Sequence, residues 1–119
     1  MILVAIGGAV GAVMRHGVSL VVVGWLGRPT PYGTLFVNVV GSFVLGALVT
    51  WAARVEAPPD VKLLIGTGLC GALTTFSTFS VESLHLFHQG HRGAALANVL
   101  LNVVVGLGAA AAGMAVAGR

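Results

Sequence analysis

Long apolar runs dominate this chain, and only short polar segments interrupt them. With Pro and charged residues taken as boundaries, four apolar segments remain, at about 2–25, 33–53, 61–87 and 93–118. Each has roughly the 20 apolar residues that a helix needs to cross a bilayer. The connections are short, and the prolines in the first two end or begin helices because proline has no amide donor. The pattern predicts an all-α membrane protein, with residues 1–119 forming one domain of four antiparallel transmembrane helices.

Composition strengthens this prediction and narrows the function. Hydrophobic residues make up 57% of the chain and charged residues only 8%, with a mean hydropathy of +1.02. Four spans use nearly all of the chain, so any function must lie within the membrane. The net charge is +3, but the six basic residues stand singly, which argues against nucleic acid as a partner. The N-terminus lacks the basic region of a cleaved signal peptide, so we expect the first segment to remain as a span.

The charges near the ends of the spans give only a weak signal for orientation. One side of the membrane receives Arg54, Lys62 and Arg119, and the other receives Arg28 and Arg92. Chains with so small a bias can insert both ways, and two inverted copies can then pair about an axis in the membrane plane. The alternative is a single orientation with a small difference in charge.

Small residues recur four positions apart, at a spacing that allows helix backbones to approach closely in lipid. The pairs are Gly7 with Gly11, Gly8 with Ala12, and Ala109 with Gly113. We interpret these pairs as packing positions without a chemical role.

Polar side chains form two stripes within the apolar segments. Thr34, Asn38 and Ser42 lie four residues apart on one face of the second segment, and Asn98 and Asn102 repeat the spacing in the fourth. A buried amide is costly unless it finds hydrogen-bond partners, so the stripes either bond helices together or line a wetted path. Together with the third segment, they favour a path.

The third segment contains the least expected residues. After Gly66, Gly68 and Gly71 come five hydroxyl side chains, which are Thr74, Thr75, Ser77, Thr78 and Ser80. Glycine beside Ser and Thr is typical of a broken membrane helix, whose freed backbone groups need other partners. We therefore predict a break near residues 70–75, where unpaired carbonyl oxygens can hold a small hard cation.

Two phenylalanines and two charged residues complete the candidate site. Phe76 and Phe79 are three residues apart, so both can face one groove, where their positive ring edges suit a small anion. Ordinary helix packing is the alternative. Arg15 costs about 2.5–3.5 kcal/mol near the bilayer centre and is a functional candidate on that ground. Glu82 is the only acidic residue inside a span, and we expect it either to lie at the mouth of the path or to pair with a basic residue.

Four stretches of the sequence resemble the small fluoride channels of the Fluc/CrcB family, in order and spacing. They are GGAVGAVMR at residues 7–15, GTLFVNVVGSF at 33–43, GLCGALTTFSTFS at 68–80 and NVLLN at 98–102. The resemblance spans nearly the whole chain, and the third stretch is the most specific. Asn102 departs from the pattern, because many relatives have a serine there.

The resemblance implies a channel, not an enzyme, in the bacterial inner or plasma membrane that lets fluoride leave the cell passively. It further implies an antiparallel homodimer in lipid, with two pores and a central structural sodium ion held by the carbonyls of Gly71 and Thr74. The pore and fluoride-binding residues implied are Asn38, Phe76, Phe79, Thr34, Ser77, Thr78 and Asn102. By the same resemblance, Arg15 and Glu82 belong to the vestibule.

Two other functions fit a small four-helix membrane protein. A proton-coupled multidrug antiporter of this size needs a carboxylate in its first span, and here that span holds Arg15 and no acid. A non-transporting assembly protein would use the polar stripes only to bond helices together. Both alternatives stay open from the sequence alone.

Overall fold

The computed structural model describes residues 1–119 and contains helices and no strands. Its elements are α1 (Ile2–Leu26), α2 (Tyr32–Arg54), α3 (Pro59–Val61), η1 (Lys62–Cys70), α4 (Gly71–Leu73), α5 (Phe76–His88), α6 (Arg92–Leu100), η2 (Leu101–Val105) and α7 (Gly106–Ala117). They join into four rods long and apolar enough to cross a membrane, which are Ile2–Leu26, Tyr32–Arg54, Pro59–His88 and Arg92–Ala117. The prediction of four membrane-crossing helices is confirmed.

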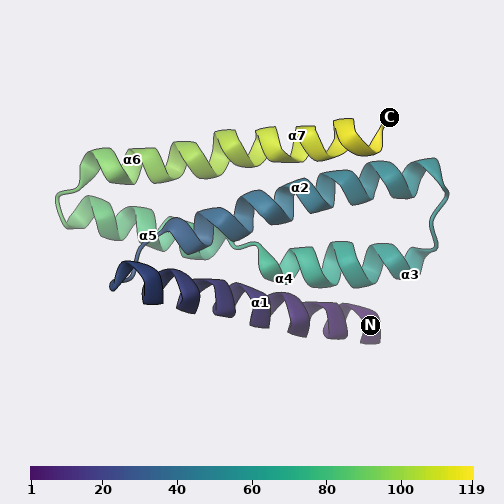
Figure 1. The fold of residues 1–119 in the computed structure, drawn as a ribbon, viewed down its shortest axis with the longest axis horizontal. Coiled ribbons are helices and arrows are strands. Elements are labelled where there is room, and N and C mark those ends of the chain that lie inside the picture. Colours follow the sequence, from purple (N-terminus) through teal and green to yellow (C-terminus); the bar gives the residue numbers. More distant parts are fainter.

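The four rods lie roughly antiparallel, so both termini are at the same end of the molecule (Figure 1). α1 occupies one edge, and the rod formed by α6, η2 and α7 occupies the other. α2 packs most extensively on α7, α1 packs on η1 and α4, and α5 packs on α6. The first half of the third rod therefore packs mainly on α1 and the second half on α6, while α2 contacts both halves.

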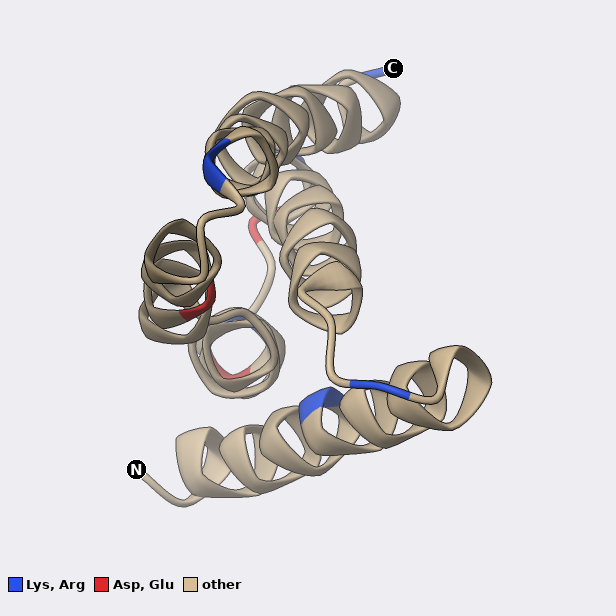
Figure 2. Cartoon of the chain, turned by 90° about the vertical axis from the view of Figure 1, so that its left-hand side faces the viewer, with Lys and Arg blue, Asp and Glu red and all other residues tan.

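A glycine and a proline mark two of the rod ends, and of these only the proline was predicted from the sequence. α1 ends at Gly27, whose φ of 67° lies in the left-handed region that glycine adopts without strain. Its amide donates to the carbonyl of Val23 at 2.8 Å. The third rod begins at Pro59, a position where the missing amide donor costs nothing. Charged residues are few and scattered over the bundle (Figure 2), as a chain surrounded by lipid requires.

Glycine allows the closest helix contacts. A Cβ atom at Gly7 would clash with the carbonyl oxygen of Leu64, and one at Gly113 would clash with that of Phe43. α1 therefore meets η1, and α7 meets α2, at backbone distance. A Cβ atom at Gly8 would have no atom within 4 Å. Gly8 therefore does not pack closely against another helix of the same chain, in contrast to Gly7 and Gly113.

The third rod is interrupted at two residues. Thr74 has φ −81° and ψ 153°, and Thr75 has φ −151° and ψ 113°, so both are extended between α4 and α5. This break confirms the one predicted near residues 70–75. Thr75 then caps α5, because its Oγ1 accepts a hydrogen bond of 3.2 Å from the amide of Thr78.

Two stretches wind more widely than an α-helix, which the sequence did not predict. η1 and η2 are π-helices, of nine and five residues. η1 leads into the break, and η2 contains Asn102. Such widened turns change which side chains face a neighbouring helix, and they occur often at functional sites.

Candidate functional site

The break in the third rod opens onto a small cavity of about 240 Å³ between three of the four rods. Seven of the residues named from the sequence line it, which are Asn38, Ser42, Thr74, Thr75, Phe76, Phe79 and Asn102. Its remaining walls are Gly41, Leu45 and Val103. Residues from distant parts of the chain thus converge here through amides, hydroxyls and rings, with no charged group among them.

Asn38 pairs with the backbone of the break. Its Oδ1 accepts a hydrogen bond of 2.7 Å from the amide of Thr75, and its Nδ2 donates to the carbonyl of the same residue at 3.1 Å. One side chain of α2 therefore satisfies both backbone groups of Thr75, as a neighbouring β-strand would. Without this pairing, two buried backbone groups would lack a partner, which is costly in lipid.

A chain of hydrogen bonds continues from Asn38 into the fourth rod and back to α5. Asn38 Nδ2 donates to Asn102 Oδ1 at 2.8 Å, and Asn102 Nδ2 donates to Asn98 Oδ1 at 3.1 Å. Asn98 Nδ2 donates to Ser83 Oγ at 2.9 Å, and Ser83 donates to the carbonyl of Phe79 at 2.7 Å. We call Asn38, Asn102, Asn98 and Ser83 the amide ladder. It joins α2, the fourth rod and α5 around the cavity.

The two phenylalanine rings touch each other beside the cavity. Their centroids are 4.9 Å apart and their planes meet at 80°, so the edge of one ring faces the other ring. Phe79 is 7% exposed and Phe76 is 77% exposed. The structure thus brings both rings to one groove, but only Phe79 is covered within a single chain.

The hydroxyl groups at the break form a small cluster of their own. Thr75 Oγ1 donates to Thr78 Oγ1 at 2.9 Å and lies 3.3 Å from Ser77 Oγ. Ser77 and Thr78 are exposed on the outer face of the third rod, as is Gly71 before the break. Gly71, Ser77 and Thr78 are not part of the cavity lining, and they lie open on the single chain.

Glu82 and Thr34 form a separate polar contact along the same two helices. Thr34 Oγ1 donates to Glu82 Oε1 at 2.7 Å. Glu82 also lines a cleft of about 400 Å³ with Thr30 and His85, between the first connection and α5. Glu82 Oε2 and Thr30 Oγ1 are both buried and have no hydrogen-bond partner. The cleft thus has room, and unused polar atoms, for water or an ion at this end of the bundle.

Arg15 lies apart from these groups. It is half-buried on α1, outside the cavity lining, and its carbonyl accepts a hydrogen bond from Ser19 Oγ at 3.1 Å. Within one chain the structure does not bring Arg15 to the other candidate residues.

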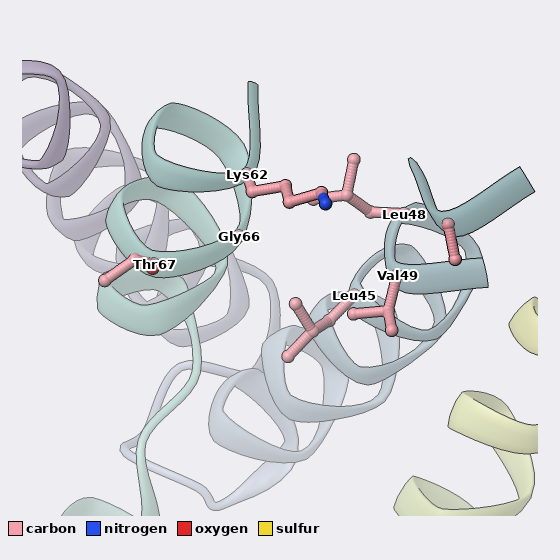
Figure 3. A pocket seen from close by; sticks show the side chains of 7 residues that line it. Leu45, Leu48, Val49, Lys62, Gly66 and Thr67 are labelled. Atoms are coloured by element: carbon pink, nitrogen blue, oxygen red, sulfur yellow. The ribbon is translucent and has the colours of Figure 1, made fainter. Parts of the chain in front are cut away.

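A larger hollow of about 480 Å³ lies elsewhere, between α2 and η1. Its walls are mainly Leu45, Leu48 and Val49, and the Lys62 side chain extends across it toward Leu48 (Figure 3). A single amine beside an apolar wall offers no set of converging donors. We therefore place the candidate site at the smaller polar cavity.

Ser83 is the participant that sequence reasoning missed, and Thr75 was recognised only as one hydroxyl among five. Ser83 is four residues beyond Phe79 and eight beyond Thr75, which is the spacing of one helix face. It is also buried, at 7% exposure. That spacing was the available signal.

The chain is similar to known proteins over most of its length. The family model described as "CrcB-like protein, Camphor Resistance (CrcB)" matches residues 2–114. The chain is 48% identical over 103 residues to a protein of Shewanella denitrificans named fluoride-specific ion channel FluC, covering 87% of this chain and 83% of that protein. Proteins of the same name from Shewanella frigidimarina and Shewanella amazonensis are 48% and 46% identical, covering 88% and 86% of this chain. These two matches cover 85% and 82% of the respective proteins.

The matches extend over all four rods and include the break and the cavity. Identity near one half across most of both chains is far above what a shared fold alone requires. The chain therefore belongs to the CrcB family and is a multi-pass integral protein of a bacterial membrane.

Proposed function

We propose that this protein is a fluoride channel through which the ion leaves the cell passively. The observation that carries the proposal is the convergence of Asn38, Phe79 and Asn102 on one uncharged cavity at the break. The relatives named fluoride-specific ion channel support fluoride as the ion. Protonated hydrogen fluoride crosses membranes and ionises in a neutral cytoplasm, so a passive exit for the anion protects the cell.

Neutral groups suit this task. Fluoride is small and strongly hydrated, so a path for it must replace water with other donors step by step. Amides, hydroxyls and ring edges supply partial positive charge without a full one, and they can hold the anion without trapping it. Thr34, Ser77 and Thr78 extend such groups along the path, and Arg15 and Glu82 belong to its vestibules.

A structural sodium ion at the break is part of the proposal. In a continuous helix the amide of Thr75 would bond to the carbonyl of Gly71, but here it donates to Asn38. The Gly71 carbonyl therefore loses its helical donor, and the Thr74 carbonyl does so because the amide of Thr78 donates to Thr75 Oγ1. Carbonyl oxygens are ligands that hard cations accept. These residues fit the ion, which would add fixed positive charge close to the anion path.

Two inverted copies complete the proposed channel, with two pores. Gly71, Ser77 and Thr78 are exposed on the outer face of the third rod. Polar groups are costly against lipid tails, so a second copy of this face is a better neighbour than the bilayer. Pairing about an axis in the membrane plane would also bring two sets of break carbonyls together, which gives the sodium ion more ligands than one chain offers.

A liposome assay tests the proposal. Purified protein is reconstituted into vesicles loaded with potassium fluoride or potassium chloride, and release is followed with ion-selective electrodes after a potassium ionophore is added. We expect rapid release of fluoride, little release of chloride, and no requirement for a proton gradient. Fluoride that stays trapped would refute the proposal, and proton-driven uptake of a cationic drug would favour the antiporter.

A further inference from the structure

We infer that Asn38 is a positioning residue that holds the helix break open, and that the amide ladder fixes the direction of its side chain. This inference deepens the proposed function, because the break forms one wall of the proposed path. It differs from a simple contact between Asn38 and the ion, since it assigns the asparagine a role before any ion arrives.

At the break, the amide of Thr75 donates to Asn38 and not to its helical acceptor. An uninterrupted helix would use the Thr75 amide as the donor to Gly71, four residues earlier. Asn38 Oδ1 takes that donor at 2.7 Å, which is shorter than the common 2.9–3.0 Å for such bonds. Asn38 Nδ2 also donates a hydrogen bond to the Thr75 carbonyl. One side chain therefore keeps Thr75 extended and leaves the Gly71 carbonyl without its helical partner.

Both N–H donors of the Asn38 amide are already engaged in hydrogen bonds. An asparagine amide has two N–H donors. One is used on the Thr75 carbonyl at 3.1 Å and the other on Asn102 Oδ1 at 2.8 Å. Asn38 therefore has no free donor in this arrangement. An anion in the cavity would have to displace Asn102, whereas the two bonds to Thr75 can stay in place.

The other residues of the amide ladder fix the orientation of the Asn38 amide group. If its amide were reversed, Nδ2 would face the Thr75 amide and Oδ1 would face two oxygen acceptors. Asn102 opposes this reversal because its own Nδ2 is held by Asn98 Oδ1 and by the Asn98 carbonyl, at 3.1 and 2.9 Å. Asn98 and Asn102 are 4% and 9% exposed, so little water can compete.

Hydrogen exchange at the Thr75 amide tests the inference. Thr75 lies outside any helix, so its protection must come from the side chain of Asn38. In the reconstituted wild type we expect slow exchange. In Asn38→Leu, which keeps the size but removes the acceptor, the Thr75 amide should exchange about tenfold faster, the factor that corresponds to one lost hydrogen bond. Ser42→Ala, one turn along α2 on the same cavity, is the matched control and should leave the exchange unchanged.

Asn38→Asp separates positioning from contact with the ion. A carboxylate still accepts from the Thr75 amide, but it can donate neither to the Thr75 carbonyl nor to Asn102 Oδ1. We therefore expect slow exchange at Thr75 in this variant, although its negative charge should strongly reduce fluoride release. This variant keeps the test decisive if Asn38→Leu fails to fold.

Several results would overturn the inference. Fast exchange at Thr75 in the wild type, equal exchange in the wild type and Asn38→Leu, or fast exchange in Asn38→Asp would each do so. Loss of fluoride release in both Asn38 variants with unchanged Thr75 exchange would mean that Asn38 only contacts the ion. The same vesicles report on the proposed function separately, because a wild type that releases no fluoride refutes the channel and leaves the exchange result valid.

Discussion

Thr34 on α2 and Glu82 on α5 are joined by a hydrogen bond of 2.7 Å, in which the threonine hydroxyl donates to Oε1 of the carboxyl group. The residues are 48 positions apart in sequence, and this bond ties the second half of the third rod to α2. Glu82 Oε2 has no partner within the chain. The threonine hydroxyl is therefore the one side-chain donor that Glu82 has here.

Removing that donor should destabilise the bundle. We expect Thr34→Val to lower the free energy of unfolding by about 0.6–1.7 kcal/mol, between the average and the largest value for hydrogen bonds between membrane helices. Equilibrium unfolding in mixed micelles measures the change. Thr34→Ser, which keeps the hydroxyl, is the control and should lose less. Equal stability of the valine and serine variants would show that the bond contributes nothing.

Substitution of Phe76 and of Phe79 should distinguish a role in fluoride conduction from a role in packing. Phe79 is buried and Phe76 is exposed, yet both line the cavity and they touch edge to face. We expect Phe→Ile at either position to slow fluoride release by up to about tenfold, because the positive ring edge is lost. Only Phe79→Ile should also lower the unfolding free energy.

Release from fluoride-loaded vesicles and unfolding in micelles test these two expectations on the same preparations. Unchanged release in both variants would assign the rings to packing alone. A stability loss in Phe76→Ile as large as that in Phe79→Ile would mean that Phe76 is covered by another chain.

Much of the fold could be predicted from local sequence features. Prolines and charges mark the ends of the four rods, and Gly71 followed by Thr74 and Thr75 marks the break, because these signals act within a few residues. The π-helices η1 and η2 could not be predicted in this way. They change the winding by small amounts that no residue type demands, and packing between rods decides them.

Most residues of the candidate site were predicted from the sequence, but the hydrogen bonds between them were not. Asn38, Phe79 and Asn102 were singled out because polar or ring side chains are conspicuous in apolar helices. Their partners depend on how the rods are rotated against one another, so the pairing of Asn38 with the Thr75 backbone has no local signature. The ladder through Asn98 to Ser83 was missed for the same reason. The grouping of Arg15 with the other residues is absent in the single chain.

The bundle should tolerate alanine in place of a helix glycine only where no backbone of a neighbouring helix lies opposite that glycine. A Cβ atom at Gly113 would clash with the carbonyl oxygen of Phe43, whereas one at Gly108 meets nothing within 4 Å. We expect Gly113→Ala to lower the unfolding free energy by about 1–3 kcal/mol, as overpacking does. Gly108→Ala on the same helix is the matched control and should be neutral or slightly stabilising, because alanine favours helix. A neutral Gly113→Ala would mean that α7 and α2 separate easily.

Orientation in the membrane gives the last prediction. With three basic residues on one side and two on the other, insertion should occur both ways. We replace buried Cys70 with Ala and introduce one cysteine at Gln89 or, in a second protein, at Asp60. Both positions are exposed; Asp60 lies in α3 and Gln89 in the turn between α5 and α6, and these segments are at opposite ends of the bundle (Figure 1). Each should react with an impermeant thiol reagent from both sides of the membrane of intact cells and inverted vesicles.

The two cysteine positions act as each other's control. A chain with one orientation would label at Gln89→Cys from one side only and at Asp60→Cys from the other side only. Dual insertion would label about half of each protein from either side, because every inverted pair presents both ends to both faces. In the proposed channel, such an inverted partner shields the exposed polar face of Gly71, Ser77 and Thr78 from lipid. One-sided labelling would therefore remove the antiparallel pair, and with it the proposed arrangement of two pores around one sodium ion.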